Sequence, residues 1–392
     1  METLKLKAPF NNRLKYGHWW IFSNELEKIR TDINPGEICR FEYSNGAPCG
    51  VGFFNPHSLI SGRLLVKNSY SLDDNFVKDR IAAAFEHRKA LGLDKYCRIF
   101  FGESDFIGGL VIDRYGDIFC VQIISAGAEL LSAKISQALY ELFSPKAIII
   151  KRDHQYRHLE GIEKKEDEIL GKLPKKIIIE ENGCKYEVDL ALGQKTGWYF
   201  DQRENRAFLI PFFEGKKVLD LYCYTGAFSV LAAKNGAEIV WGADSSEKAV
   251  ELAQKNAQLN KIKEDKIIFQ KCDAEKMLDA LEKGELPEKP DFILLDPPNF
   301  IRSKKNSPQA EKLYAKLLSK VLRALPSGGY AAFSTCSQHI SPFTFEDIIK
   351  NAAMISSRKT FLLEHRYQSK DHPILAGMEE TRYLNFALLR VK

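Results

Sequence analysis

The sequence predicts an α/β protein. Its C-terminal part is expected to form a doubly wound, largely parallel sheet, preceded by a small β-rich domain and a small central α/β domain. Two observations lead to this fold class. From about residue 191 apolar strands alternate with helices at the spacing of βαβ units, and before residue 70 short strands are separated by turn signals. The expected domains are residues 1–70, 71–190 and 191–392.

The first 70 residues contain three turn signals between strand-like stretches: Asn34-Pro35-Gly36, Asn45-Gly46 and Asn55-Pro56. The region carries nine basic and six acidic side chains, a local charge of 9 − 6 = +3, which fits a module that contacts RNA and equally a solvated surface. The aromatic cluster at residues 17–22 is interpreted either as a corner of the core or as a surface on which bases stack.

The middle of the chain contains predicted helices, hairpins and one buried strand. Asn182-Gly183 is its strongest turn signal, because this pair favours the two-residue turn of a β-hairpin. The expected helices are 73–91 and 130–142, and the expected strands are 110–113, 118–124, 147–151, 175–180 and 184–189.

The C-terminal part alternates between strands and helices, which is typical of a doubly wound sheet. Strands are expected at 217–222, 237–242, 266–270, 292–295 and 329–334. Helices are expected at 228–234, 247–260, 276–283 and 309–324.

Composition limits the function classes. The 392 residues carry a net charge of 57 − 52 = +5 and are 45% hydrophobic, which excludes a mainly disordered chain. No apolar run approaches the ~18–20 residues that span a bilayer, and the N-terminus has no secretory pattern, so a cytoplasmic protein without membrane partners is expected. The eight cysteines are scattered with no Cys-x-x-Cys pair, so neither a metal site nor a disulfide framework is expected.

Four acidic residues end or follow successive predicted strands: Asp220, Asp244, Asp273 and Asp296. Ligands of a doubly wound sheet bind beyond the carboxyl ends of its strands. The turn after the first strand, residues 223–228, has a single glycine and does not match the G-x-G-x-x-G phosphate cradle of dinucleotide-binding proteins. A carboxylate at Asp220 would repel a phosphate, but it suits a cationic ligand such as the methionine end of S-adenosylmethionine.

The other acids match the remaining parts of the same ligand. Asp244 can accept hydrogen bonds from both ribose hydroxyls, and Asp273 is placed to accept one from the adenine amino group. Pro297 and Pro298 fix the backbone that holds Asp296 over the cleft. Each acid alone could be a helix N-cap or a loop charge, but four in order are poorly explained that way. The sequence therefore predicts S-adenosylmethionine as the cofactor.

The chain resembles the class I, Rossmann-like methyltransferases. More closely, it is similar to the RNA cytosine-5 methyltransferases of bacterial large-subunit ribosomal RNA that carry an N-terminal PUA-like domain. The most specific matching string is GQKTGWYFDQRENR at 193–206. Further matches lie at 17–23, 102–105, 112–116, 159–161, 371–373 and 383–386. The resemblance covers nearly the whole chain and implies ribosomal RNA as substrate and partner; a homodimer is left open.

The resemblance further implies that the segment 195–206 lines the cofactor pocket. Together with the strand ends, this gives the candidate cofactor-binding residues Lys195, Thr196, Arg203, Asp220, Tyr222, Thr225, Gly226, Asp244, Ser245, Asp273 and Asp296.

The fifth predicted strand leads to Cys336, at the same sheet edge as Asp296. A thiolate that adds to carbon 6 of cytosine makes carbon 5 able to accept a methyl group, and the resemblance assigns this nucleophilic role to Cys336. Asp296 is the candidate for binding or protonating the N3 edge of the base. Alternatively, Cys336 is a small buried strand residue. Cys223, in the first turn, is expected to pack near the cofactor rather than to catalyse.

Two other functions stay open. The family often has Lys after the Pro-Pro pair, where this chain has Asn299, and its middle signature Asp-Gly-Leu-Pro-Gly is replaced here by residues 105–109. Because an Asp/Asn-Pro-Pro-aromatic motif also occurs in enzymes that methylate exocyclic amines, one alternative is a guanine N-methyltransferase acting on ribosomal RNA. The other is a non-catalytic RNA-binding assembly factor, against which the four strand-end acids argue.

Overall fold

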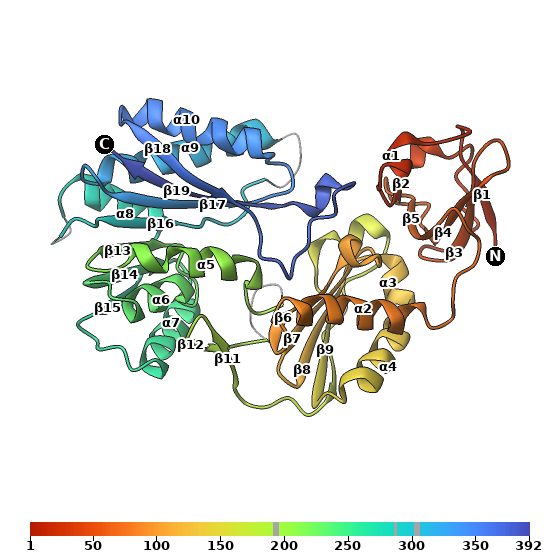
Figure 1. Cartoon of the computed structure of the whole chain (residues 1–392), viewed down its shortest axis with the longest axis horizontal. Helices are drawn as coiled ribbons and strands as arrows, with labels where there is room; N and C mark the ends of the chain where they lie inside the picture. Colours follow the sequence, from red (N-terminus) through yellow and green to blue (C-terminus); the bar gives the residue numbers. More distant parts are fainter. Residues whose placement is uncertain (191–195, 286–287, 302–305) are drawn as a thin grey trace. The chain divides into compact units, whose positions relative to one another are not determined.

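The computed structural model describes residues 1–190, 196–285, 288–301 and 306–392, and these form two compact units (Figure 1). Unit 1 comprises Met1–Ile177, Val188–Phe200 and Lys370–Thr381. Unit 2 comprises Ile178–Glu187, Asp201–Ser369 and Arg382–Lys392. Each unit is therefore built from three separate segments of the chain.

The first part of unit 1 is a five-stranded sheet with the strand order β1-β3-β4-β5-β2. The bounds are β1 Thr3–Lys5, α1 Asn12–Lys15, β2 Trp20–Ile21, β3 Ile38–Glu42, β4 Pro48–Phe54 and β5 Gly62–Lys67. Leucine, isoleucine and phenylalanine side chains of these elements, with Cys39 and Cys49, form its hydrophobic core. This confirms the β-rich N-terminal part that the turn signals predict.

The second part of unit 1 is a mixed sheet with the order β10-β9-β8-β7-β6. Its elements are α2 Phe76–Ala90, β6 Tyr96–Phe101, β7 Leu110–Tyr115, β8 Ile118–Ile123, α3 Ala126–Leu130, α4 Ser132–Phe143, β9 Ala147–Lys151 and β10 Glu168–Gly171. The two sheets share one core, because Phe53 and Leu65 of the first sheet belong to the hydrophobic cluster of the second. A Cβ on Gly127 of α3 would lie 2.1 Å from Cγ of Phe53, so only glycine fits this contact.

The aromatic cluster at residues 17–22 packs against other residues of unit 1, with His18 and Ile21 buried and the other aromatic side chains half-buried. His18 is 3% exposed, and the ring of Trp19 lies 4.7 Å from that of Phe106. The indole Nε1 of Trp20 donates to Glu103 at 3.2 Å. These contacts favour the interpretation of the cluster as a corner of the core over that of a base-stacking surface.

The Asp371-His372-Pro373 motif has a structural role in unit 1. Asp371 is fully buried and accepts a hydrogen bond from the backbone N–H of Arg98 at 3.0 Å. The Ser104 hydroxyl donates to the carbonyl of Pro373 at 2.7 Å. The segment that connects two strands of unit 2 is therefore anchored in the interior of unit 1.

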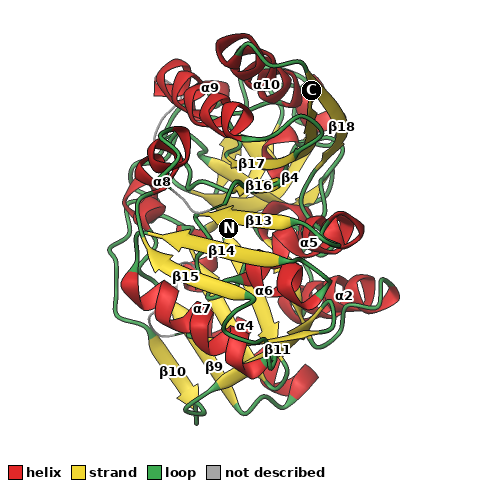
Figure 2. Ribbon diagram, turned by 90° about the vertical axis from the view of Figure 1, so that its left-hand side faces the viewer, coloured by secondary structure: helices red, strands yellow, loops and turns green. Residues whose placement is uncertain are grey.

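Unit 2 contains a seven-stranded sheet with the order β15-β14-β13-β16-β17-β19-β18, in which β13 to β17 pair in parallel and β19 is antiparallel (Figure 2). The strands are β13 Lys217–Leu221, β14 Ile239–Asp244, β15 Ile267–Lys271, β16 Phe292–Leu295, β17 Tyr330–Cys336, β18 Thr360–Arg366 and β19 Leu384–Val391. The strand order reverses at β13, which confirms the doubly wound fold and places a switch point between β13 and β16.

Helices cover both faces of this sheet. The helices are α5 Arg203–Leu209, α6 Ala227–Lys234, α7 Glu247–Leu259, α8 Ala274–Glu282, α9 Ser307–Ala324 and α10 Pro342–Ser356. Helices α8, α9 and α10 form a hydrophobic core with one face of the central strands. Helices α6 and α7 pack against the other face (Figure 1).

A separate hairpin of β11 Ile177–Glu181 and β12 Cys184–Val188 precedes the sheet, and its residues 178–187 belong to unit 2. Its turn has φ values of 51° at Asn182 and 76° at Gly183, as the Asn-Gly pair predicts. The division of the chain into three domains at about residues 70 and 190 stays a proposal.

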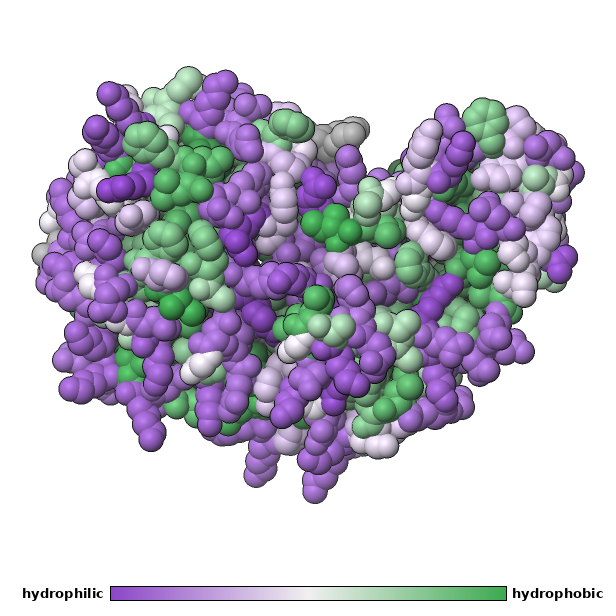
Figure 3. Space-filling view, in the orientation of Figure 1, coloured by the Kyte–Doolittle hydropathy of each residue, from purple (hydrophilic) through white to green (hydrophobic). Residues whose placement is uncertain are grey.

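Hydrophilic side chains predominate on the face drawn in Figure 3, with apolar side chains in scattered patches. Within the described residues, the helices are all too short or too polar to cross a membrane.

Candidate functional site

Strand alternation places the candidate acids on one face of the unit 2 sheet. Leu219 and Leu221 of β13, and Ala331 and Phe333 of β17, point into the core formed with α8, α9 and α10. Side chains alternate along a strand, so the intervening residues face the opposite side, toward α6. Ala243 of β14 and Leu295 of β16 belong to the same core, so the residues next to them on these strands also face α6. Asp220, Asp244, Asp296, Ser334 and Cys336 therefore share the α6 face.

The strand register brings these residues to the same level of the sheet. Asp220 pairs with Gly242 on one side and with Leu294 on the other, and Leu294 pairs with Ala332. Two residues further along each strand, Asp244, Asp296 and Ser334 form the next row at the carboxyl edge. Cys336 lies one row beyond Ser334 on β17.

Asp220 is a buried carboxyl group with one side-chain partner. It is 1% exposed, and the hydroxyl of Ser229 in α6 donates to its Oδ2 at 2.5 Å. Burial raises the pKa of Asp220 to about 7; the Ser229 hydrogen bond opposes this shift, and the neighbouring Asp296 and Asp244 add to it. A cation placed beside Asp220 would offset the cost of its charge.

The turn after β13 has an unusual backbone. Tyr222 and Tyr224 have φ values of 62° and 48°, and Gly226 has 78°. The left-handed region is unfavourable for bulky residues, and such strain collects at functional sites. A Cβ on Gly226 would lie 2.9 Å from the ring of Phe269, so this glycine is required by packing as well as by φ. The Gly226 N-cap begins α6 directly behind the turn.

Asp244 holds the same turn from the neighbouring strand. Its Oδ2 accepts from the backbone N–H of Tyr224 at 3.0 Å, and its Oδ1 accepts from that of Ser246 at 2.8 Å. Each carboxylate oxygen has a further lone pair, so the side chain can still accept two hydroxyl donors. Ser245, beside it, is exposed.

Asp273 is exposed and caps α8. Its Oδ1 accepts from the backbone N–H groups of Glu275 and Lys276 at 2.9 and 3.2 Å. The N-cap explanation therefore holds for this acid, although its other oxygen is not used by the cap. Burial raises the pKa of Tyr222 to about 12, and the charges of Asp273 and Asp244 contribute, so the phenol of Tyr222 lies near both acids.

Asp296 is held at the end of β16 by two donors. The Ser334 hydroxyl and the side-chain amide of Gln202 both donate to its Oδ1, the latter at 3.3 Å. Burial raises the pKa of Asp296 to about 6, an effect that the Ser334 hydrogen bond opposes and the charge of Asp201 increases. Asp201 in turn accepts from the hydroxyl of Tyr383 at 2.6 Å. A carboxyl with a pKa this close to neutral can hold or release a proton at physiological pH.

Tyr314 of α9 fixes the loop that follows Asp296. Its hydroxyl donates to the carbonyl of Pro298 at 3.2 Å and accepts from the backbone N–H of Phe300 at 3.1 Å, and its ring lies 4.9 Å from that of Phe300. Burial raises the pKa of Tyr314, and the nearby Cys336 and Asp296 add to the shift. The buried tyrosine, the Pro-Pro loop and Cys336 are therefore close neighbours.

The two cysteines near the site differ in their surroundings. Cys336 ends β17 and is partly exposed. Burial, together with the charges of Asp220 and Asp244, raises the pKa of Cys223 well above its usual range. A thiol that resists ionisation is a poor nucleophile, which favours packing over catalysis for Cys223.

Three predicted cofactor residues lie elsewhere or outside the described residues. Lys195 is outside the described residues. Thr196 belongs to unit 1, where its carbonyl accepts from the hydroxyl of Tyr115 at 2.9 Å. Arg203 is buried in unit 2 and pairs with Glu181 of the β11–β12 hairpin at 3.2 Å. The structure therefore gives Thr196 and Arg203 partners within the protein, and their contact with a cofactor stays a prediction.

The sequence analysis missed the residues that support the acids. Ser229, Gln202, Ser334 and Tyr314 hold Asp220, Asp296 and the following loop, yet none of them forms a motif with its partner. Gln202 is 94 positions from Asp296. Only its place in the most specific string of the sequence, residues 193–206, could have drawn attention to it.

One buried polar atom fits a bound nucleoside-type cofactor. The Oγ1 of Thr225 is buried in the strained turn and has no hydrogen-bond partner among the described residues. A buried hydroxyl without a partner is costly, and a ligand in the turn would supply one. The carboxylates of the site also fit, because they can accept hydrogen bonds from ribose hydroxyls and their negative charge suits a sulfonium. Among the described residues there is no cluster of His, Cys, Asp and Glu that could hold a metal ion.

Comparison with known proteins shows the family of the chain. Residues 4–67 match the family model of a PUA-like domain, and residues 212–379 match that of a methyltransferase domain. The chain is 34% identical over 381 residues to the ribosomal RNA large subunit methyltransferase I of Escherichia coli strain UTI89, covering 95% of each chain. It is 35% identical over 383 residues to the protein of the same name from Aeromonas hydrophila, covering 96% of each.

Solved structures show the same fold. A SAM-dependent methyltransferase from Streptococcus mutans superposes with a TM-score of 0.85 over 100% of both chains at 23% identity. A methyltransferase structure in complex with SAH gives a TM-score of 0.85 over 100% of both chains at 24% identity.

Asp244→Ala is expected to weaken S-adenosylmethionine binding by about 10- to 100-fold. It removes the charged side chain that is predicted to accept hydrogen bonds from the ribose hydroxyls, and charge-assisted hydrogen bonds contribute about 1.5–3 kcal/mol. Isothermal titration calorimetry measures the affinity. Glu247→Ala is the control, because Glu247 is an exposed acid nearby that pairs with Lys271 at 2.9 Å. Equal affinity of the Asp244 variant and the wild type would remove Asp244 from the site.

Asp220→Asn is expected to stabilise the protein in a pH-dependent way. The pKa of Asp220 is about 7 in the folded state, above its value in the unfolded state. Between about pH 4 and 7 the folded state therefore binds more protons than the unfolded state, so the wild type loses stability as the pH rises through this window. The neutral amide removes this cost. Urea unfolding should show a gain of about 1–3 kcal/mol at pH 8 that disappears below pH 4. The exposed Asp265→Asn is the control, and a gain that does not vary with pH would contradict the analysis.

Proposed function

This chain belongs to the family of the ribosomal RNA large subunit methyltransferase I proteins, and we propose that it methylates large-subunit ribosomal RNA. S-adenosylmethionine is its cofactor and, when bound, supplies a methyl group activated by a sulfonium sulfur. The finer proposal is that the product is 5-methylcytosine and that Cys336 is the nucleophile.

The cofactor is proposed to occupy the carboxyl edge over the turn between β13 and α6. Asp244 would accept the ribose hydroxyls, and the unpartnered hydroxyl of Thr225 would gain a hydrogen bond. Asp220 would provide negative charge for the cationic end, because a bound cation would offset the cost of ionising this buried carboxyl group. Asp273, beside Tyr222, is proposed for the adenine end of the site.

RNA recognition is proposed for the N-terminal sheet, which matches a PUA-like domain. The cluster at residues 17–22 is buried or half-buried, whereas Phe10 and Tyr16 nearby in the sequence are exposed, at 63% and 72%. Lys15 lies beside the ring of Tyr16, with its ammonium 6.0 Å from the centroid. An exposed aromatic ring next to a cation suits stacking on a base with contact to its phosphate.

The proposed chemistry begins with the Cys336 thiolate. Its sulfur forms a bond to carbon 6 of the target cytosine, which places electron density on carbon 5 and lets that atom accept the methyl group. Transfer of the proton from carbon 5 to a water molecule then returns an electron pair to the ring, and the carbon–sulfur bond breaks. The thiolate leaves unchanged, so the step needs no oxidant or reductant.

Asp296 is proposed to act on the N3 edge of the base during this addition. Its pKa of about 6 lets it carry a proton to N3 as charge develops there and take the proton back when the adduct collapses. Ser334 and Gln202 hold one of its oxygens, so the other is left to face the base.

One observation carries the cytosine assignment. Cys336 lies on the same face and the same edge of the sheet as Asp296, one row beyond the Ser334 that contacts it. An enzyme that methylates an exocyclic amine needs the carboxyl and the Pro-Pro loop but has no use for a thiol at this position. Asn299, which stands in place of the family lysine, uses its Oδ1 in a local turn with the N–H of Ile301 at 2.8 Å.

RNA with 5-fluorocytosine at the target position is expected to trap the protein covalently. Fluorine on carbon 5 cannot leave as a proton does, so the bond between Cys336 and carbon 6 persists after methyl transfer. A denaturing gel should show a shifted band that requires S-adenosylmethionine. Cys336→Ala should remove both the band and methylation while leaving cofactor binding intact.

Cys223→Ala is the matched control and should keep the adduct, because its thiol resists ionisation. Full methylation by Cys336→Ala, or a methylated guanine as the product, would overturn the cytosine-5 proposal. Loss of cofactor binding in Cys336→Ala would show instead that the thiol belongs to the cofactor side of the site.

A further inference from the structure

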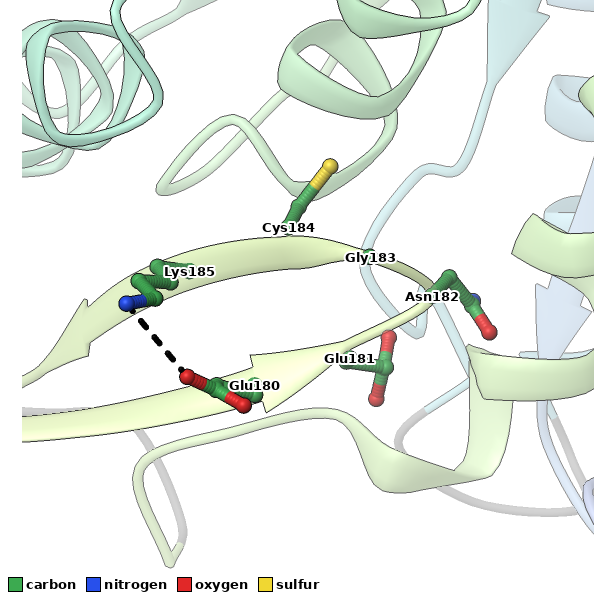
Figure 4. A pocket seen from close by; sticks show the side chains of 6 residues that line it. All are labelled: Glu180, Glu181, Asn182, Gly183, Cys184 and Lys185. Atoms are coloured by element: carbon green, nitrogen blue, oxygen red, sulfur yellow. Dashed lines mark ion pairs between the residues drawn. The ribbon is translucent and has the colours of Figure 1, made fainter.

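Among the described residues, β11 and β12 pair only with each other and with no third strand. Residues 178–187 of this hairpin nevertheless belong to unit 2. A hollow of about 250 Å³ beside its turn is lined by residues 180–185. Glu180 and Lys185 form an ion pair across the two strands at 3.5 Å, and Figure 4 marks this pair with a dashed line. All the lining residues come from this one hairpin and none from the carboxyl edge of the sheet. The hollow therefore lies away from the candidate site, whereas the contacts that hold the hairpin extend toward it.

Two buried asparagines dock the hairpin: Asn256 of α7 and Asn260, the C-cap of the same helix. Asn260 accepts from the backbone N–H of Lys185 at 2.9 Å and donates to its carbonyl at 2.6 Å, as a neighbouring strand would. One helical turn earlier, Oδ1 of Asn256 accepts from the backbone N–H of Glu187 at 2.7 Å. The amides of α7 therefore replace strand pairing along β12.

Asn256 also reaches the strained turn. Its Nδ2 donates to the carbonyl of Thr225 at 3.0 Å, and the side chain is fully buried. One amide thus connects the hairpin to the segment Tyr222–Gly226, using its acceptor on one side and its donor on the other. Asn260 has no such contact with the turn among the hydrogen bonds found for its side chain.

The hairpin is anchored independently on its other side. The hydroxyl of Tyr186 donates to the carbonyl of Ala227, the first residue of α6, at 3.1 Å. Glu181 pairs with Arg203 at 3.2 Å and with Arg206 at 2.6 Å, and all three are buried. With these anchors the hairpin is a fixed support against which Asn256 can hold the turn.

We propose that Asn256 is a positioning residue for the cofactor, because it holds the Thr225 carbonyl and so keeps the turn Tyr222–Gly226 in its strained conformation. Two non-glycine residues with positive φ need surrounding contacts to persist. Asp244 supplies one such contact at Tyr224, and Asn256 supplies one at Thr225. The inference rests on the proposed location of the cofactor at this turn.

Asn256→Asp separates the two roles of the side chain. The carboxylate keeps an acceptor for the N–H of Glu187, but it loses the donor and sets a negative oxygen against the carbonyl of Thr225. Calorimetry should show S-adenosylmethionine binding about tenfold weaker. Hydrogen–deuterium exchange should show faster exchange of the amides of residues 223–226, with the amides of the hairpin unchanged.

Asn260→Ser is the matched control, because it weakens the docking of the same hairpin without touching the turn. It should lower the melting temperature and leave the affinity for S-adenosylmethionine unchanged. Equal loss of affinity in both variants, or wild-type affinity in Asn256→Asp, would overturn the inference. If Asn256→Asp does not fold, Asn256→Ser replaces it, because serine is uncharged and too short to reach both partners. Wild-type affinity in Asn256→Ser, or a loss of affinity equal to that of Asn260→Ser, would then overturn the inference.

The Asp244→Ala measurement distinguishes this inference from the proposed function. Weaker binding in Asp244→Ala with normal binding in Asn256→Asp would reject the positioning role alone. Normal binding in both variants would reject the location of the cofactor at this turn.

Discussion

The site depends on the parallel register of β14, β13, β16 and β17. This register sets Asp244, Asp296 and Ser334 in one row at the carboxyl edge, with Asp220 one row below, all on the face toward α6. Burial removes these carboxyl groups from water, which raises the pKa of Asp220 to about 7 and that of Asp296 to about 6. Repulsion by Asp296 and Asp244 adds to the shift of Asp220, and repulsion by Asp201 adds to that of Asp296. The sheet therefore builds a place where a cation is favoured before any cofactor arrives.

Such a site lowers the stability of the protein, and the surrounding structure offsets that cost. Ser229 and Ser334 each donate a hydroxyl to one buried carboxyl, and Tyr314 fixes the loop after Asp296. The turn after β13 is held against its strain from two sides, by Asp244 and by Asn256. These supporting residues lie on α6, α7, α9, β14 and β17. Helices on both faces of the sheet therefore hold the residues at its carboxyl edge in place.

The central strands and helices of unit 2 could be predicted because each has a clear period and a turn signal at its end; strand 292–295 is observed with the predicted bounds. The sequence analysis did not predict α10, β18 or β19. Strand β18 is a sheet edge with Phe361, Leu362 and Leu363 all exposed, so it lacks the alternation that marks a strand. The acids could be predicted because they lie at or just after the ends of strands. The residues that support them could not be predicted, because contacts such as that of Gln202 with Asp296 join distant positions. Asp273 shows that an acid after a strand can also be the N-cap of the next helix.

We propose that this sheet edge makes 5-methylcytosine in large-subunit ribosomal RNA. The most direct test is mass-spectrometric nucleoside mapping of that RNA from cells lacking the gene, compared with cells complemented by the wild type or by Cys336→Ser. We expect 5-methylcytosine to disappear at a single position, to return with the wild-type gene, and to stay absent with Cys336→Ser. An unchanged 5-methylcytosine pattern together with the loss of a methylated guanine would contradict the account.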